Sequence, residues 1–361
     1  MIHSPAQITP AFLTPILQAA GVLRQATVTA ICAEPLAAKA SFNAQMARLR
    51  LTYDVQEAEA PQSLIAKLPT ANAELWENAA VFRPGAKECW FYRYGAARTP
   101  VNVPYCYYNA VDAAMGESFL LLEDLAPARV GDWVEGVSLE EAELALRSLA
   151  RLHAAWWATE ATAEPELAQL MDNPQEAQDL VERLYQQAWL QFLGRAPCEI
   201  PGDVRQFGER LAGRIAAAEA MLDHSPWTLV HGDFRLGNIL FGARHGEPAC
   251  WVIDWEDIAL WSGMLDVAWF LGGCLRVEES DEEEGLLRRY HQALTREGVA
   301  GYPWAQCYHD YRGAMLSCFV QGILTAVPPE TGDEYAHNLA RVVGERFIMA
   351  SRRLRLYELM P

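Results

Sequence analysis

The stretch HGDFRLGNIL, residues 231–240, places several polar residues in one short segment between apolar runs. Asp233 and Asn238 are separated by four residues, which is the spacing of loops that catalyse phosphoryl transfer. An Asp at the start of such a loop can accept a hydrogen bond from an attacking hydroxyl, and the Asn amide oxygen can bind Mg²⁺. Arg235 is a fixed cation that could contact the γ-phosphoryl group, although pairing with a surface carboxylate is an alternative.

A second oxygen ligand for Mg²⁺ is expected from Asp254 in the segment WVIDW. The chain between Asn238 and Asp254 has the pattern of a hairpin, which would bring the two residues together. His231 is expected to brace the loop through a hydrogen bond to backbone or to Asp254. Asp257 adds a further negative charge, which would either hold water on the metal or face solvent.

Phosphoryl transfer also needs a lysine on a strand, held by a glutamate on the following helix. Lys67 in SLIAKLP fits the lysine, because a lone ammonium in an apolar strand needs a partner. Glu88 in KECWFYRY is the predicted partner, since an aromatic, core-like face follows it. Glu74 and Glu77 are the alternatives.

The nucleotide itself is expected to contact two further segments. Adenine would bond to backbone around Glu123 to Leu125 in FLLLEDL, and Glu123 or Asp124 would bind ribose or cap the following turn. Residues 34–51 are the candidate phosphate-covering loop, but they contain no glycine, which restricts the backbone to fewer conformations. Phosphate would then be reached by backbone N–H groups of residues 41–44 and by the side chains of Ser41 and Asn43.

The elements that must position these residues fall into two parts of different character. Period-two alternation predicts strands in the first part, and helical spacing of apolar residues dominates after Leu125. Ser138, followed by Glu141, predicts a helix start. The predicted strands are 46–55, 63–69, 103–111 and 118–125, with short strands at 228–230, 238–241 and 249–255; the predicted helices are 73–97, 138–157, 163–193, 203–222, 283–297, 303–325 and 331–357.

Composition limits the classes of partner. The chain has 361 residues and a formal net charge of -18, which argues against nucleic acid and anionic membranes because both are polyanions. No apolar run is long enough to cross a bilayer and no signal peptide is recognised at the start, so a cytoplasmic protein is expected. The eight cysteines are scattered, which favours reduced thiols over a zinc site or disulfides. The sequence leaves the oligomeric state open.

Four motifs in order, LLLEDL, LARLHAAWW, HGDFRLGNIL and VIDWEDIALWSGMLDVAWFL, resemble the aminoglycoside phosphotransferase and choline kinase group. With ECWFYRY they look most like its ecdysteroid kinase-like branch. The resemblance implies an α+β, two-lobed protein-kinase-like fold, with a small antiparallel-sheet lobe at 1–124 and a larger helical lobe at 125–361. It also implies ATP and Mg²⁺ as cofactors, a small-molecule hydroxyl as acceptor, and a role for Asp266 in tying the catalytic loop to a helix; the alternative for Asp266 is a helix N-cap.

There are three alternative functions, and the sequence disfavours the first two of them. A protein kinase is disfavoured, because eleven residues between Asp254 and Asp266 are too few for a peptide-binding activation segment. A non-catalytic relative would usually have lost Lys67, Asp233, Asn238 or Asp254, and all are present. Nucleotidyl transfer on the same fold is not excluded.

The acceptor is expected to be a neutral or weakly polar alcohol rather than a polycationic sugar. The segments 186–194, 257–264 and 311–326 are the candidate pocket walls, since they are rich in Trp, Phe, Leu and Met and poor in carboxylates. The acidic stretch 277–285 is interpreted as a solvated loop. Trp156, Trp157 and His153 are interpreted as core residues, with a pocket wall as the alternative for the tryptophans.

Overall fold

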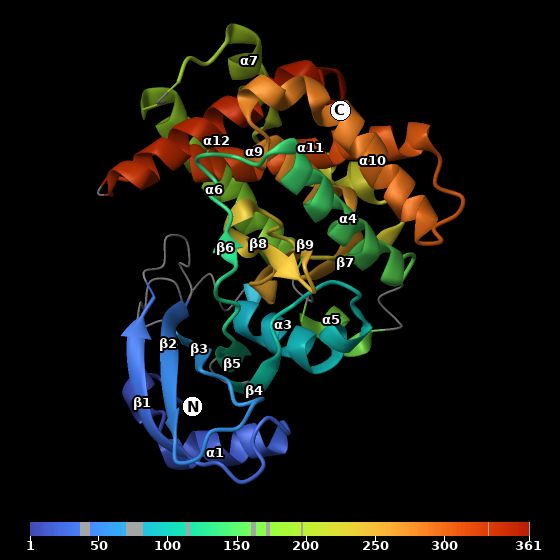
Figure 1. Cartoon of the computed structure of the whole chain (residues 1–361). Coiled ribbons are helices and arrows are strands. Elements are labelled where there is room, and N and C mark those ends of the chain that lie inside the picture. Colours follow the sequence, from blue (N-terminus) through green and yellow to red (C-terminus); the bar gives the residue numbers. More distant parts are fainter. Residues whose placement is uncertain are drawn as a thin grey trace. The chain divides into compact units, whose positions relative to one another are not determined.

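The computed structural model describes residues 1–36, 44–69, 82–112, 116–159, 164–170, 174–195, 198–330 and 332–360. These residues form two compact units (Figure 1). Unit 1 contains residues 1–98, 102–128 and 255–257, and unit 2 contains residues 99–101, 129–254 and 258–361. A sheet dominates unit 1 and helices dominate unit 2, as predicted for an α+β chain whose first part is sheet-rich and whose second part is helical.

Unit 1 is built on a five-stranded antiparallel sheet with the order β1-β2-β3-β5-β4. The sequence predicted four of these strands and missed β1. Lys67 lies in the middle of β3, paired with Met46 of β2 and Leu120 of β5, so its backbone is fixed on both sides. The strands are β1 (Val28–Pro35), β2 (Ala44–Tyr53), β3 (Ser63–Pro69), β4 (Cys106–Asp112) and β5 (Glu117–Glu123).

Alternating side chains give this sheet two covered faces. One face carries Leu64, Ala66 and Leu121, which pack with Leu13 and Leu17 of helix α1 (Pro10–Ala19). The opposite face carries residues such as Leu120 and Leu122, which pack against helix α3 (Pro84–Trp90; Figure 1). The alternation therefore places the odd-numbered Lys67 on the side of α3.

Helix α3 is short and changes type where it ends. A helix was predicted over 73–97, of which residues 73–81 lie outside the described residues. The chain continues as a π-helix at Phe91–Gly95 and a 3-10 helix at Ala96–Arg98. Phe91 stacks on Trp255 with ring centroids 3.7 Å apart and an interplanar angle of 7°. This contact anchors the helix end that follows Glu88.

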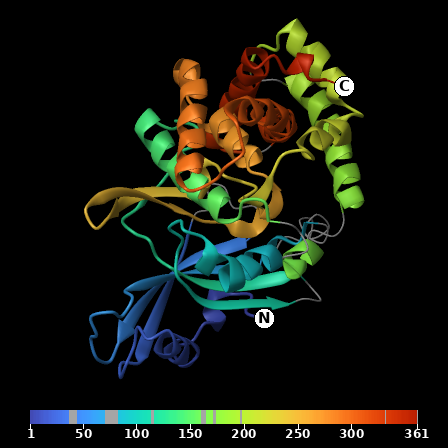
Figure 2. The same cartoon turned by 90° about the vertical axis from the view of Figure 1, so that its right-hand side faces the viewer.

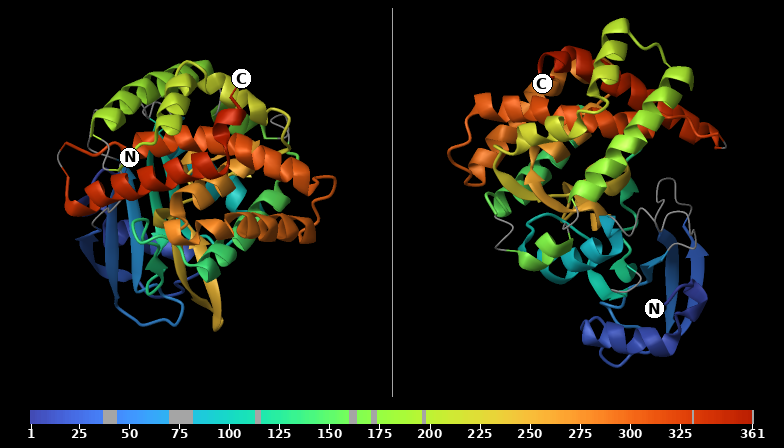
Figure 3. Two further views of the ribbon diagram at one scale, coloured as in Figure 1. Left: turned by 90° about the horizontal axis from the view of Figure 1, so that it is seen from above. Right: turned by 180° about the vertical axis from the view of Figure 1, so that it is seen from behind.

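Unit 2 contains the helical bundle and two small sheets. Helix α11 runs through its middle and packs against α6, α9 and α12 (Figure 3). Strands β8 and β9 form a hairpin whose register pairs Ile239 with Val252 (Figure 2), and β7 pairs with β10. The elements are α4 (Leu139–Ala155), α5 (Pro165–Leu170), α6 (Pro174–Arg195), α7 (Gly202–Leu211), α8 (Ile215–Glu219), α9 (Met264–Cys274), α10 (Glu283–Arg296), α11 (Trp304–Ala326), α12 (Glu334–Arg353), β6 (Arg129–Val130), β7 (Trp227–Val230), β8 (Ile239–Arg244), β9 (Glu247–Val252) and β10 (Ala259–Ser262).

Several predictions for unit 2 can be compared with the structure. The Ser138 hydroxyl accepts a hydrogen bond from the Glu141 N–H at 3.3 Å, which confirms the predicted start of α4. The helix predicted over 203–222 is interrupted at Gly213, where φ is +79° and α7 gives way to α8. Periodicity did not predict helix α9, although the resemblance implied a helix at Asp266. Its apolar residues are buried on all sides and show no single hydrophobic face to recognise.

Two expectations from composition concern the whole chain. All eight cysteines are free, as expected for reduced thiols. Within the described ranges, no helix combines the length and apolar character needed to span a membrane.

Gly322 of α11 is predicted to be essential for packing. A Cβ at this position would lie 2.3 Å from a ring carbon of Phe347 on α12. Gly322→Ala should therefore lower the free energy of unfolding by about 1–3 kcal/mol, despite the better helix propensity of Ala. Gly194→Ala in α6 is the matched control, because its Cβ would meet nothing within 4 Å and should be neutral or stabilising. Urea denaturation of both variants checks the prediction, and equal stabilities would contradict it.

Candidate active site

The segment 231–238 is held in place by its apolar residues and by the strands on either side. Strand β7 delivers it at Val230, and a 3-10 turn at Leu236–Asn238 leads into β8. Phe234 and Leu236 are each 1% exposed and anchor the loop in the core. The polar side chains between them are therefore held on a rigid backbone.

Asp233 is the centre of this loop. Its Oδ1 accepts a hydrogen bond from the Trp269 indole N–H at 2.9 Å. Its Oδ2 accepts from Arg235 Nε at 2.8 Å and from Asn238 Nδ2 at 2.9 Å. The side chain is 23% exposed, so a solvated molecule can reach this carboxylate even though three protein donors orient it.

Arg235 forms an ion pair inside the loop. The partner is Asp233 of the same loop. The guanidinium also lies over the Trp133 ring, 4.8 Å from its centroid. Burial alone would lower the pKa of Arg235, but the charge of Asp233 outweighs it and the pKa lies above its ordinary value. Arg235 therefore stays cationic at every physiological pH.

Asp266 holds the loop backbone. Its carboxylate accepts the N–H groups of His231 at 2.7 Å and of Gly232 at 2.9 Å. The predicted tie between loop and helix is confirmed, and the N-cap alternative is wrong because α9 begins two residues earlier, at Met264. His153 Nε2 lies 3.1 Å from Asp266 Oδ2, and its Nδ1 lies 2.7 Å from the Tyr290 hydroxyl.

His153 is thus a fully buried, hydrogen-bonded core residue, as predicted. Its position depends on Gly263, because a Cβ there would lie 2.7 Å from His153 Nδ1. Trp156 is buried as well and donates to Thr99 Oγ1 at 3.2 Å, which confirms the core interpretation for this tryptophan.

The β8–β9 hairpin brings the two predicted metal ligands side by side. The Ile253 N–H donates to the Asn238 carbonyl at 3.0 Å. Asp254 directly follows Ile253 in sequence, so its backbone lies close to that of Asn238. Asp254 has φ +67° and ψ +65°, a left-handed conformation that is strained for a residue with a side chain. His231 Nε2 lies 3.0 Å from the Ile253 carbonyl, which confirms the predicted brace to backbone.

The predicted ion pair of unit 1 is present. Lys67 Nζ lies 2.7 Å from Glu88 Oε2, and both side chains are buried. Glu256 of the same unit, which the sequence analysis did not single out, is a second partner at 3.4 Å. The alternatives Glu74 and Glu77 lie outside the described residues.

Three of the residues predicted to contact nucleotide or to cap the following turn make hydrogen bonds within the protein. Glu123 Oε2 accepts the Tyr105 N–H at 3.0 Å, and the Leu125 carbonyl accepts the Ala128 N–H at 2.9 Å. Asp124 accepts the Ala126 N–H at 3.2 Å and pairs with Arg48 at 2.6 Å, so this carboxylate caps the turn. Burial opposes its ionisation, but these hydrogen bonds hold the pKa of Asp124 below its usual value. Ser41 and Asn43 lie outside the described part of the chain.

Sequence reasoning missed the aromatic residues around Asp233, and two of the segments predicted as acceptor walls contribute buried residues to a core cluster. Trp189 of segment 186–194 is buried among aromatic neighbours of unit 2, and Phe319 of segment 311–326 is fully buried in the same cluster. Trp269 could have been found, because it lies three residues after Asp266 on one helix and so shares its face. Trp133 offered no such signal.

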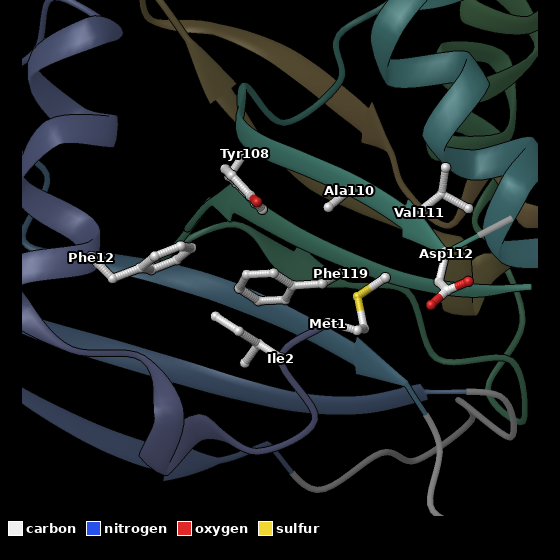
Figure 4. Close-up of a pocket in the computed structure, with 8 residues that line it drawn as sticks. All are labelled: Met1, Ile2, Phe12, Tyr108, Ala110, Val111, Asp112 and Phe119. Atoms are coloured by element: carbon white, nitrogen blue, oxygen red, sulfur yellow. The ribbon is translucent and has the colours of Figure 1, made fainter. Parts of the chain in front are cut away.

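One hollow of unit 1 lies elsewhere on the sheet and includes none of the predicted site residues (Figure 4). Its aromatic part consists of Phe12, Tyr108 and Phe119, with ring centroids 5.3–6.2 Å apart. Asp112 is the acidic residue at its edge. The full lining is Met1, Ile2, Phe12, Tyr108, Ala110, Val111, Asp112 and Phe119.

The Asp266 tie is predicted to be needed for loop geometry. In Asp266→Asn one side-chain oxygen becomes an NH₂ group, which cannot accept the backbone N–H it faces. The unfavourable contact should lower the free energy of unfolding by about 1–3 kcal/mol. Any activity that depends on Asp233 should fall at least tenfold. Asp310→Asn is the control, since Asp310 is equally buried but accepts from Tyr302; loss of activity in both variants would contradict a specific role for Asp266.

Comparison with known proteins agrees with this architecture. Solved structures of similar fold include Plasmodium vivax ethanolamine kinase (12% identity, TM-score 0.51, covering 89% of this chain and 81% of that chain). They also include choline kinase from Cryptosporidium parvum (9%, 0.53, 91% and 91%) and the GDP complex of aminoglycoside 2'-phosphotransferase-IIIa (12%, 0.55, 95% and 100%). Their identities are low, so these structures show the fold.

At the level of sequence, 4-hydroxytryptamine kinase of Psilocybe cubensis is 35% identical over 80 residues. That match spans 20% of this chain and 22% of the Psilocybe protein. The names of all these proteins are those of kinases or phosphotransferases that act on small molecules. The profile of the ecdysteroid kinase-like family matches residues 39–298, and the chain belongs to that family.

Proposed function

We propose that this protein transfers the γ-phosphoryl group of ATP to a hydroxyl of a small molecule, with Asp233 as the general base. One observation carries the proposal: the same short loop fixes the Asp233 carboxylate and holds Asn238 against it, while a backbone bond keeps Asp254 alongside. A base and two oxygen ligands on one rigid frame are what phosphoryl transfer requires of a protein.

The proposed metal ligands fit Mg²⁺ by their chemistry. The Asn238 amide nitrogen donates to both the carbonyl and the carboxylate of Asp233, at 2.9 Å each. These bonds fix which end of the amide is nitrogen, so the oxygen is the atom that Asn238 offers to a metal. Asp254 adds a carboxylate, and hard oxygen ligands of this kind suit Mg²⁺. The ion would neutralise negative charge on the phosphates as the bond between the β- and γ-phosphates breaks.

The base has room for a substrate proton on one of its oxygens. A carboxylate oxygen can accept about two hydrogen bonds. Oδ2 already accepts two, from Arg235 and Asn238, whereas the described residues supply Oδ1 with one, from Trp269. The acceptor hydroxyl would donate to Oδ1 and pass its proton there as its oxygen bonds to the γ-phosphorus. The bond between that phosphorus and the β–γ bridging oxygen would break, and ADP would leave. Arg235, which stays cationic, would contact the γ-phosphoryl group as its charge shifts.

Unit 1 would bind the nucleotide through separate groups. Lys67, oriented by Glu88 at 2.7 Å, would contact the phosphates. Backbone around Glu123 to Leu125 would meet the adenine, with the Glu123 side chain near the ribose. Ser41 and Asn43 would cover the phosphates.

The acceptor proposed here is a compact alcohol with an apolar or aromatic body. Trp269 contacts the Asp233 carboxylate directly, and Trp133 packs beside it with ring centroids 5.7 Å apart. Aromatic walls next to the base suit a molecule that buries apolar surface, whereas a polycation would need several carboxylates. Asp132, which accepts a hydrogen bond from the Tyr335 hydroxyl at 3.4 Å, is the acidic group adjacent to Trp133 in sequence.

A panel of acceptors tests this function. Ethanolamine, 4-hydroxytryptamine, benzyl alcohol and kanamycin are each incubated with Mg²⁺ and either ATP or GTP, and nucleoside diphosphate release and product mass are recorded. A mass gain of one phosphate on an aromatic alcohol with ATP is expected. Transfer of a nucleotide, or turnover of kanamycin alone, would overturn the proposal.

Asp233→Asn is predicted to abolish this turnover while preserving the fold. The amide keeps the shape of the side chain but cannot take a proton, so kcat should fall by about 10²–10⁴-fold. Binding of ATP with Mg²⁺, measured by calorimetry, should stay within about threefold, because Asp233 is not proposed to touch either. Asp203→Asn is the surface control. Normal turnover by Asp233→Asn would show that another group is the base.

Asp254→Ala is predicted to remove the metal dependence of nucleotide binding. Wild-type protein should bind ATP more tightly with Mg²⁺ than without it, since Asp254 and Asn238 would share the ion with the phosphates. The variant should bind ATP with similar affinity in both conditions. Asp179→Ala on the surface of α6 should behave as wild type. An undiminished effect of Mg²⁺ in Asp254→Ala would reject this ligand.

A further inference from the structure

A neutral donor on helix α9 touches the proposed base. The Trp269 indole N–H donates to Asp233 Oδ1 at 2.9 Å, and Trp269 is 5% exposed. The other two donors to this carboxylate, Arg235 and Asn238, come from the loop itself and both bind Oδ2. Trp269 is therefore the donor that fixes the second oxygen from outside the loop.

We propose that Trp269 is the positioning residue that directs Asp233 Oδ1 toward the acceptor hydroxyl, an inference that rests on the proposed function. With one lone pair of Oδ1 occupied by the indole, the remaining one has a defined direction. Among the described residues, two donors on Oδ2 and one on Oδ1 together prevent rotation of the carboxylate. The acceptor hydroxyl then meets a base of fixed orientation, which lowers the entropy lost on reaching the transition state.

The indole can perform this role because its own position is rigid. Its ring stacks on Phe347 of α12, with centroids 5.3 Å apart, and meets the edge of Trp133. Trp133 is itself tied down, since its indole N–H donates to the Gly273 carbonyl at 2.8 Å. Arg346 donates to the carbonyls of Trp133 and Gly273 at 2.7 and 2.9 Å. Packing and hydrogen bonds thus fix the donor before any substrate binds.

The choice of indole has a chemical consequence. Arg235 already supplies a positive charge to Asp233, and a second cation would make the carboxylate a weaker base. An indole N–H is neutral, so it orients the oxygen with less loss of basicity. Trp269 also keeps an apolar ring beside Oδ1, where a bulk water molecule would otherwise compete with the acceptor for the free lone pair.

A kinetic comparison tests the role. Trp269→Phe keeps an aromatic ring and removes the N–H, so kcat with the best acceptor of the panel should fall at least tenfold while KM for ATP stays within twofold. Trp156→Phe is the matched control. It also removes a buried indole hydrogen bond, which Trp156 donates to Thr99, and neither residue is next to Asp233 in sequence or hydrogen-bonded to it. Equal kcat values for wild type and Trp269→Phe, with similar melting temperatures, would overturn the proposal.

A spectroscopic measurement covers the case in which Trp269→Phe does not fold. In ¹⁵N-labelled protein without nucleotide, Asp233→Asn should shift the indole N–H resonance of Trp269, because the charged acceptor is lost, and leave that of Trp156 unchanged. Both resonances are assigned by their disappearance in the Phe variants, or by selective labelling. An unmoved Trp269 resonance would overturn the proposal. This measurement needs no activity, so a failure of the proposed kinase function, seen as a wild type that phosphorylates no acceptor, is distinguished from a failure of the hydrogen bond.

Discussion

The active loop depends on one buried carboxylate. Asp266 accepts two consecutive backbone N–H groups, those of His231 and Gly232, and so fixes the backbone immediately before Asp233. A buried carboxylate needs such partners, because an unpaired charge in the core is costly. The same two hydrogen bonds thus stabilise the buried Asp266 carboxylate of helix α9 and fix the orientation of the loop.

Other parts of unit 2 extend this constraint in two directions. Behind Asp266, His153 and Tyr290 link it to helices α4 and α10. In front of it, Trp269 lies one turn further along α9 and reaches Asp233 itself. A single helix therefore supports both the backbone of the loop and the carboxylate of the proposed base.

Unit 1 also contains a buried charge that needs a partner, the ammonium of Lys67. Lys67 lies at the centre of the sheet and would be unstable there alone, so α3 brings Glu88 to it. The pair is buried, and breaking a buried pair by removing one partner typically costs about 3–5 kcal/mol. Such pairs are retained for what they position more than for the stability they add, and here the positioned group is an ammonium that could meet phosphates.

The sequence alone determined the local chemistry. The spacing of Asp233 and Asn238, the hairpin that returns Asp254, and the Lys67–Glu88 pair were all predictable, because each depends on short-range periodicity or on a charge in an apolar segment. The strands of unit 1 and the start of α4 were predictable for the same reason: alternation and capping act over a few residues.

Only the tertiary structure decided which groups surround Asp233, the proposed base. Trp133 and Trp269 come from segments more than a hundred residues apart, and nothing local distinguishes Trp133 from an ordinary core aromatic. Periodicity alone did not predict helix α9, because it is apolar all round. The segments expected to line the acceptor pocket include core residues of the bundle. Periodicity reports which face of an element is buried, but it carries no information about which distant element covers that face, and the packing of whole helices settles that.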